Sequence, residues 1–363
     1  MPEMRFGIQF FPWHTAPETA NYARRAITQF PFHRVWLADH LTYENVFVTL
    51  ASLIIQTSAH VGTSVTHPFC RNPVDLASSF AALTHLAGER EVTVGIGSSA
   101  VTSDMIRKER RITMVRETVL FLRELFAGRK ATLDAFPNLA DFYHLDPAAQ
   151  AVLHLPPSRP PQIFIAGAGP RMLSLAGELG DGLILSNFSF PAALIRQGAL
   201  DEVMAPVHET LRSRDSGRPF TKVLHLHICV SRNGGHAKQF AKRIVAVALA
   251  QSNLGRDKLV QLGIPIEQAT AVEDAFRQGR GADAMEPLVT DRLIEESGII
   301  AAGTPEECIS QLDELLRLAK PYCFDMVDLA TPLGPSQEEA IDIICQEILP
   351  ELQRRSRFYQ ENG

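Results

Sequence analysis

The sequence predicts an α/β fold in which eight parallel strands close into a (β/α)8 barrel, the TIM barrel. Short β-like runs alternate with longer helical patterns along the 363 residues, and such alternation is typical of a parallel sheet. Eight repeats favour a closed barrel over an open sheet, and the length suits one barrel domain over residues 1–363.

The first four strands are each followed by a helical pattern. The strands are predicted at residues 5–11, 34–38, 60–66 and 91–97. The helices are predicted over 17–29 and 47–58, from Pro73 onward, and over 108–127. Pro73 suits the first position of a helix and Asn72 suits its N-cap, so the third helix has a defined start.

Two insertions interrupt the second half of the chain. Residues 129–160, after strand four, are rich in proline without a clean period, and they predict an excursion with a short edge strand near 152–155. A mixed helical stretch fills 265–319, and its part at 265–300 forms the insertion after strand seven. The remaining strands are predicted at 162–166, 182–186, 222–230 and 323–329. Their helices are predicted at 170–179, 191–212, 237–262 and 336–349.

Composition and charge exclude several classes of protein. Hydrophobic residues make up 45% and charged residues 21% of the chain, which is ordinary for a soluble globular protein. The net charge of −6 argues against a nucleic-acid partner, and no apolar run approaches the ~18 residues of a membrane span. The N-terminus lacks a signal-peptide pattern, and the five cysteines are widely spaced without a CxxC motif. We therefore expect a cytoplasmic protein without disulfides or a metal site.

Catalytic groups of a TIM barrel lie at the carboxyl ends of its strands, so candidate residues are sought there. His14 follows strand one, Asp39 and His40 follow strand two, and His67 follows strand three. Histidine exchanges a proton near pH 7, which makes these three histidines candidates for acid–base catalysis. A buried structural histidine would give the same pattern, and that alternative stays open. His225 and His227 face one side of strand seven, but no third metal ligand accompanies them.

The loops after strands three to five have the character of a ligand-binding surface. Ser64 and Val65 lie where unusual backbone is common, and Ser98 with Ser99 offers hydroxyl and N–H groups. After strand five a glycine-rich loop opens a helix whose N-terminus would attract an anion, aided by an arginine. This loop consists of Ala168, Gly169, Pro170, Arg171 and Met172. Met172 stands where the dinucleotide motif GxGxxG requires glycine, so a Rossmann site is excluded.

Several segments resemble the luciferase-like superfamily of flavin and deazaflavin barrels. They are VWLADH, VGTSVTHPFCRNPVDLASSFAALTHLAGER, VGIGS and IFIAGAGPRMLSLAGELGDGLI. The segments MRFGIQF, NVFVTLASLIIQTSAHVGTSVTHPF, AGTPEECISQLDEL and ATPLGPSQEEAI extend the likeness to methylenetetrahydromethanopterin reductases, which use the deazaflavin coenzyme F420. The resemblance covers nearly the whole chain and implies a luciferase-like TIM barrel that acts on a small molecule.

The resemblance implies roles for individual residues. Asp39 matches a position near the deazaflavin ring, and His40 matches one that handles protons in one branch of the superfamily. Ser64–Val65 matches a non-prolyl cis peptide behind the ring, and Ser98 and Ser99 match contacts to the ring and its side chain. The loop from Ala168 through Gly169, Pro170 and Arg171 to Met172 matches the phosphate side of the cofactor site.

Two departures from the reductases concern carboxylates. Gln9 stands where the reductases carry a glutamate, and Ala100 stands where they carry an acid after strand four. Gln9 still forms hydrogen bonds but cannot titrate, so the resemblance implies a retained cofactor site with changed substrate chemistry. Three functions stay open: hydride transfer with coenzyme F420 to a C=N, C=C or C=O substrate, an FMN-dependent monooxygenase served by a separate reductase, or a non-catalytic flavin-binding barrel.

The resemblance also implies a homodimer in which the helices after strands two and three pack across a two-fold axis. The apolar residues Leu50, Leu53 and Ile54, with Thr57, would suit that interface. The alternative is that this face packs on its own barrel.

Overall fold

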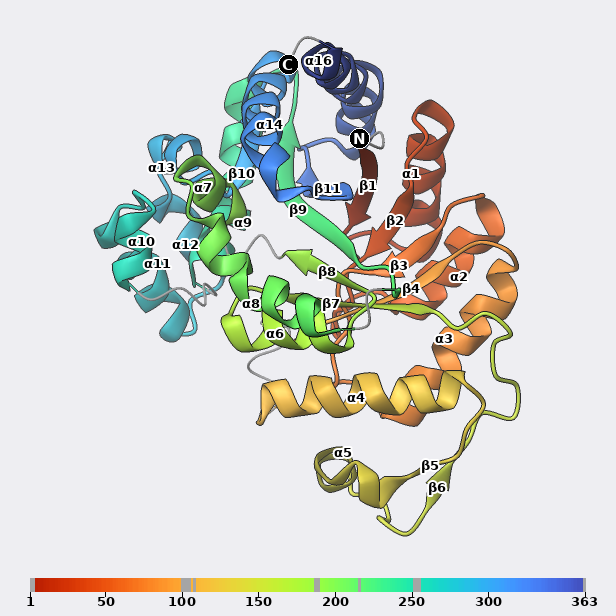
Figure 1. Ribbon diagram of the computed structural model, residues 1–363. Coiled ribbons are helices and arrows are strands. Elements are labelled where there is room, and N and C mark those ends of the chain that lie inside the picture. The colour runs from red at the N-terminus through yellow and green to blue at the C-terminus, as the bar shows by residue number, and fades with distance from the viewer. Residues whose placement is uncertain are drawn as a thin grey trace.

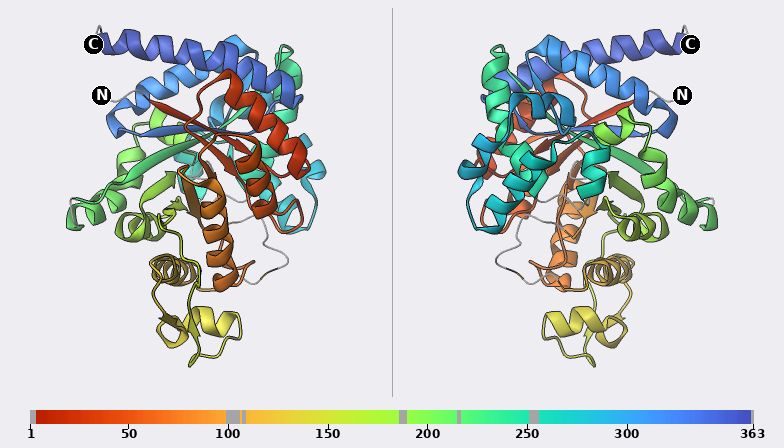
Figure 2. Two further views of the ribbon diagram at one scale, coloured as in Figure 1. Left: turned by 90° about the vertical axis from the view of Figure 1, so that its right-hand side faces the viewer. Right: turned by 90° about the vertical axis from the view of Figure 1, so that its left-hand side faces the viewer.

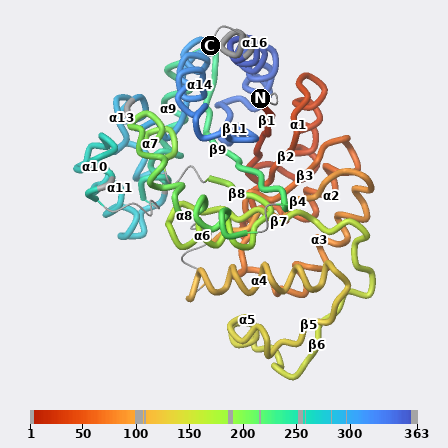
Figure 3. The backbone as a smooth tube through the Cα atoms, in the orientation of Figure 1, coloured from red at the N-terminus to blue at the C-terminus, as the bar shows by residue number. Residues whose placement is uncertain are grey.

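The computed structural model describes residues 4–98, 106, 109–185, 190–214, 217–250 and 256–361, and within them it confirms the closed parallel barrel. The barrel strands are β1 (Arg5–Phe10), β2 (Arg34–Leu37), β3 (Val61–Thr63), β4 (Val92–Ile96), β7 (Gln162–Gly167), β8 (Gly182–Leu185), β9 (Thr221–Val230) and β11 (Met326–Leu333). The sheet closes because β9 pairs with both β8 and β11, and β11 returns to β1. Figure 3 traces this closure, with the last strand beside the first.

Helices cover the outside of the barrel (Figure 1). The main ones are α1 (Ala16–Gln29), α2 (Val46–Gln56), α3 (Pro73–Ala87), α4 (Arg111–Phe126), α6 (Pro170–Leu179), α8 (Leu200–Ser213), α9 (Gly234–Ala250) and α14 (Pro305–Ala319). A shorter helix α15 (Gln337–Ile343) continues through a π-helical turn into α16 (Leu349–Glu361). Asn72 caps α3 as predicted, since its side chain accepts a hydrogen bond from the N–H of Val74. No helix in the described part of the chain is long and apolar enough to cross a bilayer.

The barrel interior combines large side chains with glycines that make room for them. Trp36 and Phe164 point inward and pack with ring centroids 6.1 Å apart. A Cβ at Gly62 would lie 2.6 Å from the Trp36 ring, and one at Gly182 would lie 2.9 Å from the Phe164 ring. Such separations are shorter than packed atoms tolerate. Glycine at these two positions therefore lets aromatic rings fill the barrel.

The excursion over 129–160 leaves the barrel below α4 and lies at the end of the molecule opposite α16 (Figure 2). Its strands are β5 (Ala131–Thr132) and β6 (Gln150–Ala151), so the edge strand falls just before the predicted 152–155. A helix α5 (Pro137–Phe142) completes it. The buried Glu117 carboxylate of α4 accepts hydrogen bonds from the N–H groups of Asn138 and Leu139, at 2.9 and 3.0 Å. It thereby satisfies the free N-terminus of α5 and joins the insertion to the barrel.

The stretch after β9 contains one strand that the sequence pattern did not reveal. It holds helices α10 (Arg256–Gln261), α11 (Ile266–Arg277), α12 (Ala282–Met285) and α13 (Asp291–Ser297), followed by β10 (Ile300–Gly303). β8 pairs with the first half of the ten-residue β9, and β10 pairs with its last four residues. The four-residue sequence IAAG is short and has little β-propensity, so its pattern does not separate it from the helical stretch predicted over 265–319. The helix predicted over 191–212 is likewise two helices, α7 (Pro191–Arg196) and α8.

The apolar face proposed for a dimer packs on its own barrel. Leu50 and Leu53 are fully buried within the chain and Ile54 is 2% exposed, so these residues are not available to a partner. On the same helix Val48 is 59% and Ile55 is 71% exposed. The homodimer itself stays a prediction, but Leu50, Leu53 and Ile54 are not its contact residues.

Candidate active site

A cavity of about 590 Å³ opens at the carboxyl ends of the barrel strands. This volume lies in the range of small-molecule and cofactor sites. It brings together nine of the ten predicted cofactor-site residues, namely Asp39, Ser64, Val65, Ser98, Ala168, Gly169, Pro170, Arg171 and Met172. Ser99 and Ala100 lie outside the described residues. The strand-end argument therefore locates the cavity, while the role of each residue stays a prediction.

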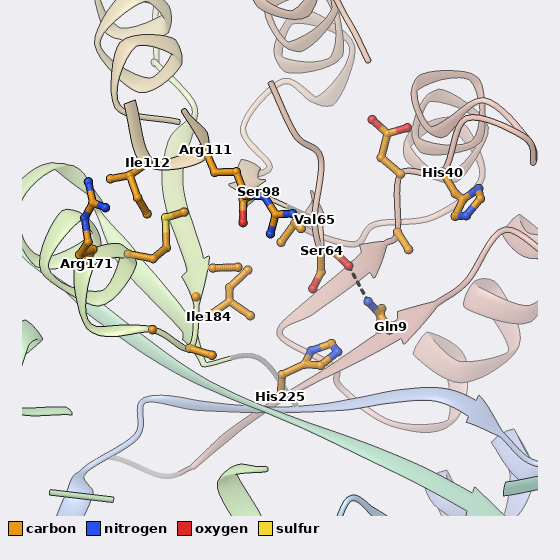
Figure 4. Close-up of a pocket in the computed structure, with 18 of the residues that line it drawn as sticks. Gln9, His40, Ser64, Val65, Ser98, Arg111, Ile112, Arg171, Ile184 and His225 are labelled. Atoms are coloured by element: carbon orange, nitrogen blue, oxygen red, sulfur yellow. Dashed lines mark hydrogen bonds between the residues drawn. The ribbon is translucent and has the colours of Figure 1, made fainter. Parts of the chain in front are cut away.

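The loop after β3 forms one wall of this cavity. The Ser64–Val65 peptide bond is cis, as the resemblance implied. The Gln9 side-chain amide donates a hydrogen bond of 2.6 Å to the carbonyl oxygen of Ser64, drawn as the dashed line in Figure 4. The N–H of Ser64 donates to the carbonyl of Leu37 at 2.8 Å. Hydrogen bonds from β1 and to β2 thus hold this wall on both sides.

Asp39 is a buried carboxylate whose oxygens are occupied by neighbours. Arg71 donates to both oxygens, at 2.9 and 3.1 Å, and the Thr66 hydroxyl donates at 2.7 Å. Burial alone would lower the pKa of Arg71, but the hydrogen bond and charge of Asp39 raise it above its ordinary value. Asp39 is therefore a fixed, charged group of the wall, and Arg71 holds it in place.

The three histidines predicted as catalytic lie in different surroundings. His40 is half-buried at the cavity wall, with Nδ1 3.1 Å from the Thr42 hydroxyl. His14 packs against Tyr22 and is not among the described residues that line the cavity. His67 is 1% exposed and also lies outside the lining, with Nε2 3.1 Å from Cys70 Sγ. Of the three, the structure places only His40 where it can meet a ligand.

The N-terminus of α6 borders the cavity and lacks a side-chain cap. Gly169 is its N-cap residue, with φ −87° and ψ 153°, and a Cβ there would meet no atom within 4 Å. The free N–H groups of the first turn and the helix dipole favour an anion at this place. Arg110, Arg111 and Arg171 also line the cavity, and Asp39 is the only carboxylate in its described lining. The donor set therefore fits a phosphate-bearing ligand.

Two further histidines, His225 and His227 of β9, form the cavity floor and were missed as site residues. Both are 6% exposed, and Figure 4 shows His225 below Ser64 and Gln9. His227 Nδ1 donates to the carbonyl of Thr331, and burial, with a smaller contribution from His225, lowers the pKa of His227 to about 3. Their alternation on strand seven is the sequence signal for this floor, although alternation alone indicates only that the two histidines share one side of the strand. The described residues contain no cluster of three His, Cys, Asp or Glu suited to a metal ion.

Comparisons with known proteins show the family of the chain and agree with its barrel fold. A family model described as luciferase-like monooxygenase matches residues 4–319. The chain is 30% identical to a 5,10-methylenetetrahydromethanopterin reductase of Methanolobus tindarius, over 95% of this chain and 100% of that protein. In fold it is similar to the coenzyme F420-dependent tetrahydromethanopterin reductase of Methanopyrus kandleri, with a TM-score of 0.73, 19% identity and coverage of 96% and 99%. It is also similar to an F420-dependent secondary alcohol dehydrogenase in complex with an F420–acetone adduct, with a TM-score of 0.70, 18% identity and the same coverage.

Proposed function

Because the chain belongs to the luciferase-like monooxygenase family, we propose that it is an oxidoreductase that uses coenzyme F420. It transfers a hydride between this cofactor and a small organic substrate with a C=N, C=C or C=O bond. Support for F420 comes from relatives named as F420-dependent dehydrogenases, one of them matched over 82% of this chain and 79% of its own length, and from a fold shared with F420-dependent enzymes. The observation that carries the proposal is one cavity with an uncapped helix N-terminus on one side and ionisable histidines on another.

We assign the phosphate side of the cofactor to α6. The backbone around Gly169 and the Arg171 guanidinium would bind the anion, and the Ser64–Val65 wall would support the ring. When bound, a deazaflavin supplies the hydride chemistry, and the protein supplies orientation and proton transfer. Gln9 positions the Ser64 carbonyl and does not transfer a proton, because its amide donates there and does not titrate.

The substrate proposed here differs from methylenetetrahydromethanopterin. Where the resemblance implies a glutamate, this chain has Gln9, whose amide already donates a hydrogen bond to the Ser64 carbonyl. Among the described residues that line the cavity, the histidines are the groups that ordinarily exchange a proton near pH 7, and His40 is the candidate that the resemblance supplies. Neither the segment 265–300 nor the excursion over 129–160, which were expected to shape the substrate pocket, contributes a residue to the described lining of this cavity.

A side-by-side binding titration with coenzyme F420 and FMN, each oxidised and reduced, tests the proposal. Tighter binding of F420 supports hydride transfer and directs the substrate search to imines, enones and alcohols. The description of the family model favours a second candidate, an FMN-dependent monooxygenase served by a separate reductase. Tighter binding of FMN would replace the first proposal by this one, and oxygen consumption would be the next assay. Binding of neither would leave a non-catalytic barrel.

A further inference from the structure

Under the cavity floor, one inward-facing row of residues crosses four neighbouring strands. In the parallel registers Arg34 of β2 lies beside Gly7 of β1, and Gly7 lies beside Asp328 of β11. Asp328 in turn lies beside His225 of β9. Because adjacent residues of a parallel register point to the same face, this row places a carboxylate directly behind a histidine of the cavity.

Burial of the Asp328 carboxylate costs free energy, because the group loses its contact with water. It is 0% exposed, and the donors around it, the Trp36 indole N–H and the His225 ring, do not reach its oxygens with ordinary hydrogen-bond geometry. Burial raises the pKa of Asp328, while His225, the Trp36 indole N–H and Arg34 act in the opposite direction. A buried carboxylate without well-formed hydrogen bonds destabilises a fold, so a contribution to stability does not explain why it is there.

The neighbouring strand is built to admit this carboxylate. A Cβ on Gly7 would lie 2.1 Å from Oδ1 of Asp328 and 3.0 Å from Nε1 of Trp36. Any other residue on β1 at this height would push the carboxyl group aside. At the far end of the row Arg34 forms its ion pair with Glu91, so the arginine is neutralised by another acid. Asp328 is then left facing His225.

His225 connects this carboxylate to the cavity. Its Nδ1 lies 3.8 Å from Oδ2 of Asp328, and the residue itself lines the cavity floor. This distance is longer than an ordinary hydrogen bond, but His225 already favours the charged form of Asp328 in the ligand-free protein, and such contacts commonly shorten further when a ligand binds. We propose that His225 is the catalytic acid–base group of this cavity and that Asp328 is its positioning residue.

The inference rests on the proposed function, and it specifies where the second hydrogen comes from. Reduction of a C=N, C=C or C=O bond adds a hydride to one atom and a proton to the other. The His225 imidazolium gives the proton from Nε2 to the atom that carries the new electron pair and becomes neutral imidazole. In the oxidising direction, Nε2 takes that proton back. Asp328 keeps Nδ1–H directed away from the cavity, so Nε2 is the nitrogen that faces the ligand.

Nitrogen-15 NMR on the ligand-free protein tests the pairing without any assay of activity. In the wild-type protein we expect neutral His225 as the Nδ1–H tautomer. In Asp328→Leu the acceptor is gone, and the tautomer shifts toward Nε2–H. His227 is a matched internal control on the same strand with the same exposure, because its Nδ1–H is held by Thr331 and should not change. An Nε2–H tautomer of His225 in the wild type, or no shift in the variant, overturns the inference.

Stability and turnover separate a functional role from a structural one. Asp328→Leu should unfold at a temperature equal to or above that of the wild type, since it replaces an unpaired buried carboxylate by an apolar side chain. With reduced coenzyme F420 and a panel of imines, enones and ketones, Asp328→Leu and His225→Gln should each lower turnover by roughly 10²–10⁴-fold. Asp328→Asn is the second variant if Asp328→Leu fails to fold. Full turnover in a folded variant, or a lower unfolding temperature in both Asp328→Leu and Asp328→Asn, contradicts the inference.

The two proposals fail in different ways. If the protein binds neither F420 nor FMN, the proposed function is lost, while the tautomer measurement on the free protein still decides the His225–Asp328 pairing. If the cofactor binds and the tautomer does not depend on Asp328, the proposed function stands and the acid–base group lies elsewhere, with His40 as the first alternative.

Discussion

Substitution of Gly169 by aspartate should raise the free energy of unfolding slightly and, at the same time, lower the affinity for the cofactor. Gly169 is the N-cap of α6, its backbone is extended, and its Cβ position is open, so a side chain fits without strain. Aspartate and asparagine are preferred at an N-cap over glycine, because their side-chain oxygen accepts from the first-turn N–H groups. We therefore expect unfolding stability to rise by a few tenths of a kcal/mol for both residues.

The effect on binding follows from charge. A carboxylate about 4 Å from a phosphate costs roughly 1 kcal/mol per pair of unit charges in water and about 4 kcal/mol at the screening typical of a protein surface. The position is open to solvent on the cavity side, so the lower part of this range applies. Affinity for the phosphate-bearing cofactor should then fall about five- to a hundredfold in Gly169→Asp.

Three variants divide this effect into its causes. Gly169→Ala adds only a methyl group and should bind as the wild type does. Gly169→Asn occupies the first-turn N–H groups without a charge, and Gly169→Asp adds the charge. Fluorescence titration of each variant with F420 and FMN, together with thermal unfolding, measures both properties. Equal affinity of the Asp and Asn variants would refute the electrostatic argument, and equal affinity of all three would place the phosphate elsewhere.

Three other outcomes are expected. Arg71→Met should lower unfolding stability by about 3–5 kcal/mol, because it leaves the buried Asp39 carboxylate without two hydrogen bonds; Asp39→Asn added to it should recover part of the loss in a double-mutant cycle. Gln9→Glu should weaken cofactor binding and make that binding depend more strongly on pH. A carboxyl group facing the Ser64 carbonyl has to be protonated before it can donate the hydrogen bond that the Gln9 amide donates. Binding to the variant that does not change with pH would contradict this role of Gln9. Burial lowers the pKa of His227 to about 3, against an ordinary 6.5, so the unfolded chain binds a proton at a higher pH than the folded protein does. The stability that neutral His227 allows should therefore be fully present above pH 6.5, and the free energy of unfolding should fall by up to about 1.4 kcal/mol per pH unit toward pH 3. In His227→Asn it should fall less steeply.

The sequence was most informative where local pattern decides structure. Alternating periods predicted the barrel strands, and the position of Asp39, Ser64 and Gly169 just after strands predicted the cavity they share. The direction in which a side chain points was harder to predict from the sequence. His67 follows a strand as His40 does, but its ring contacts Cys70 and the residue is not in the described lining of the cavity. Order along the chain places a residue at a strand end and does not say which way its side chain points.

The sequence alone could not predict contacts between strands that lie far apart along the chain. His225 and Asp328 are separated by about a hundred residues, and only the register between β9 and β11 places them side by side. A single sequence without that register shows a lone histidine on one strand and a lone aspartate on another. The short strand β10 was missed for a similar reason, because its partner β9 and not its own composition makes it a strand.

The way in which β10 joins β9 has a consequence for how this protein could be re-engineered. The N–H of Ser231, where the chain leaves β9, donates to the carbonyl of Gly303 at the end of β10, at 3.2 Å. The whole segment between these two residues therefore departs from and returns to neighbouring points of the barrel. A cassette with such closely spaced ends can be exchanged between related barrels at little cost in loop closure. Since Ile244 in this segment lines the cavity, we expect a chimera of this kind to alter that apolar part of the lining while keeping the two histidines of β9.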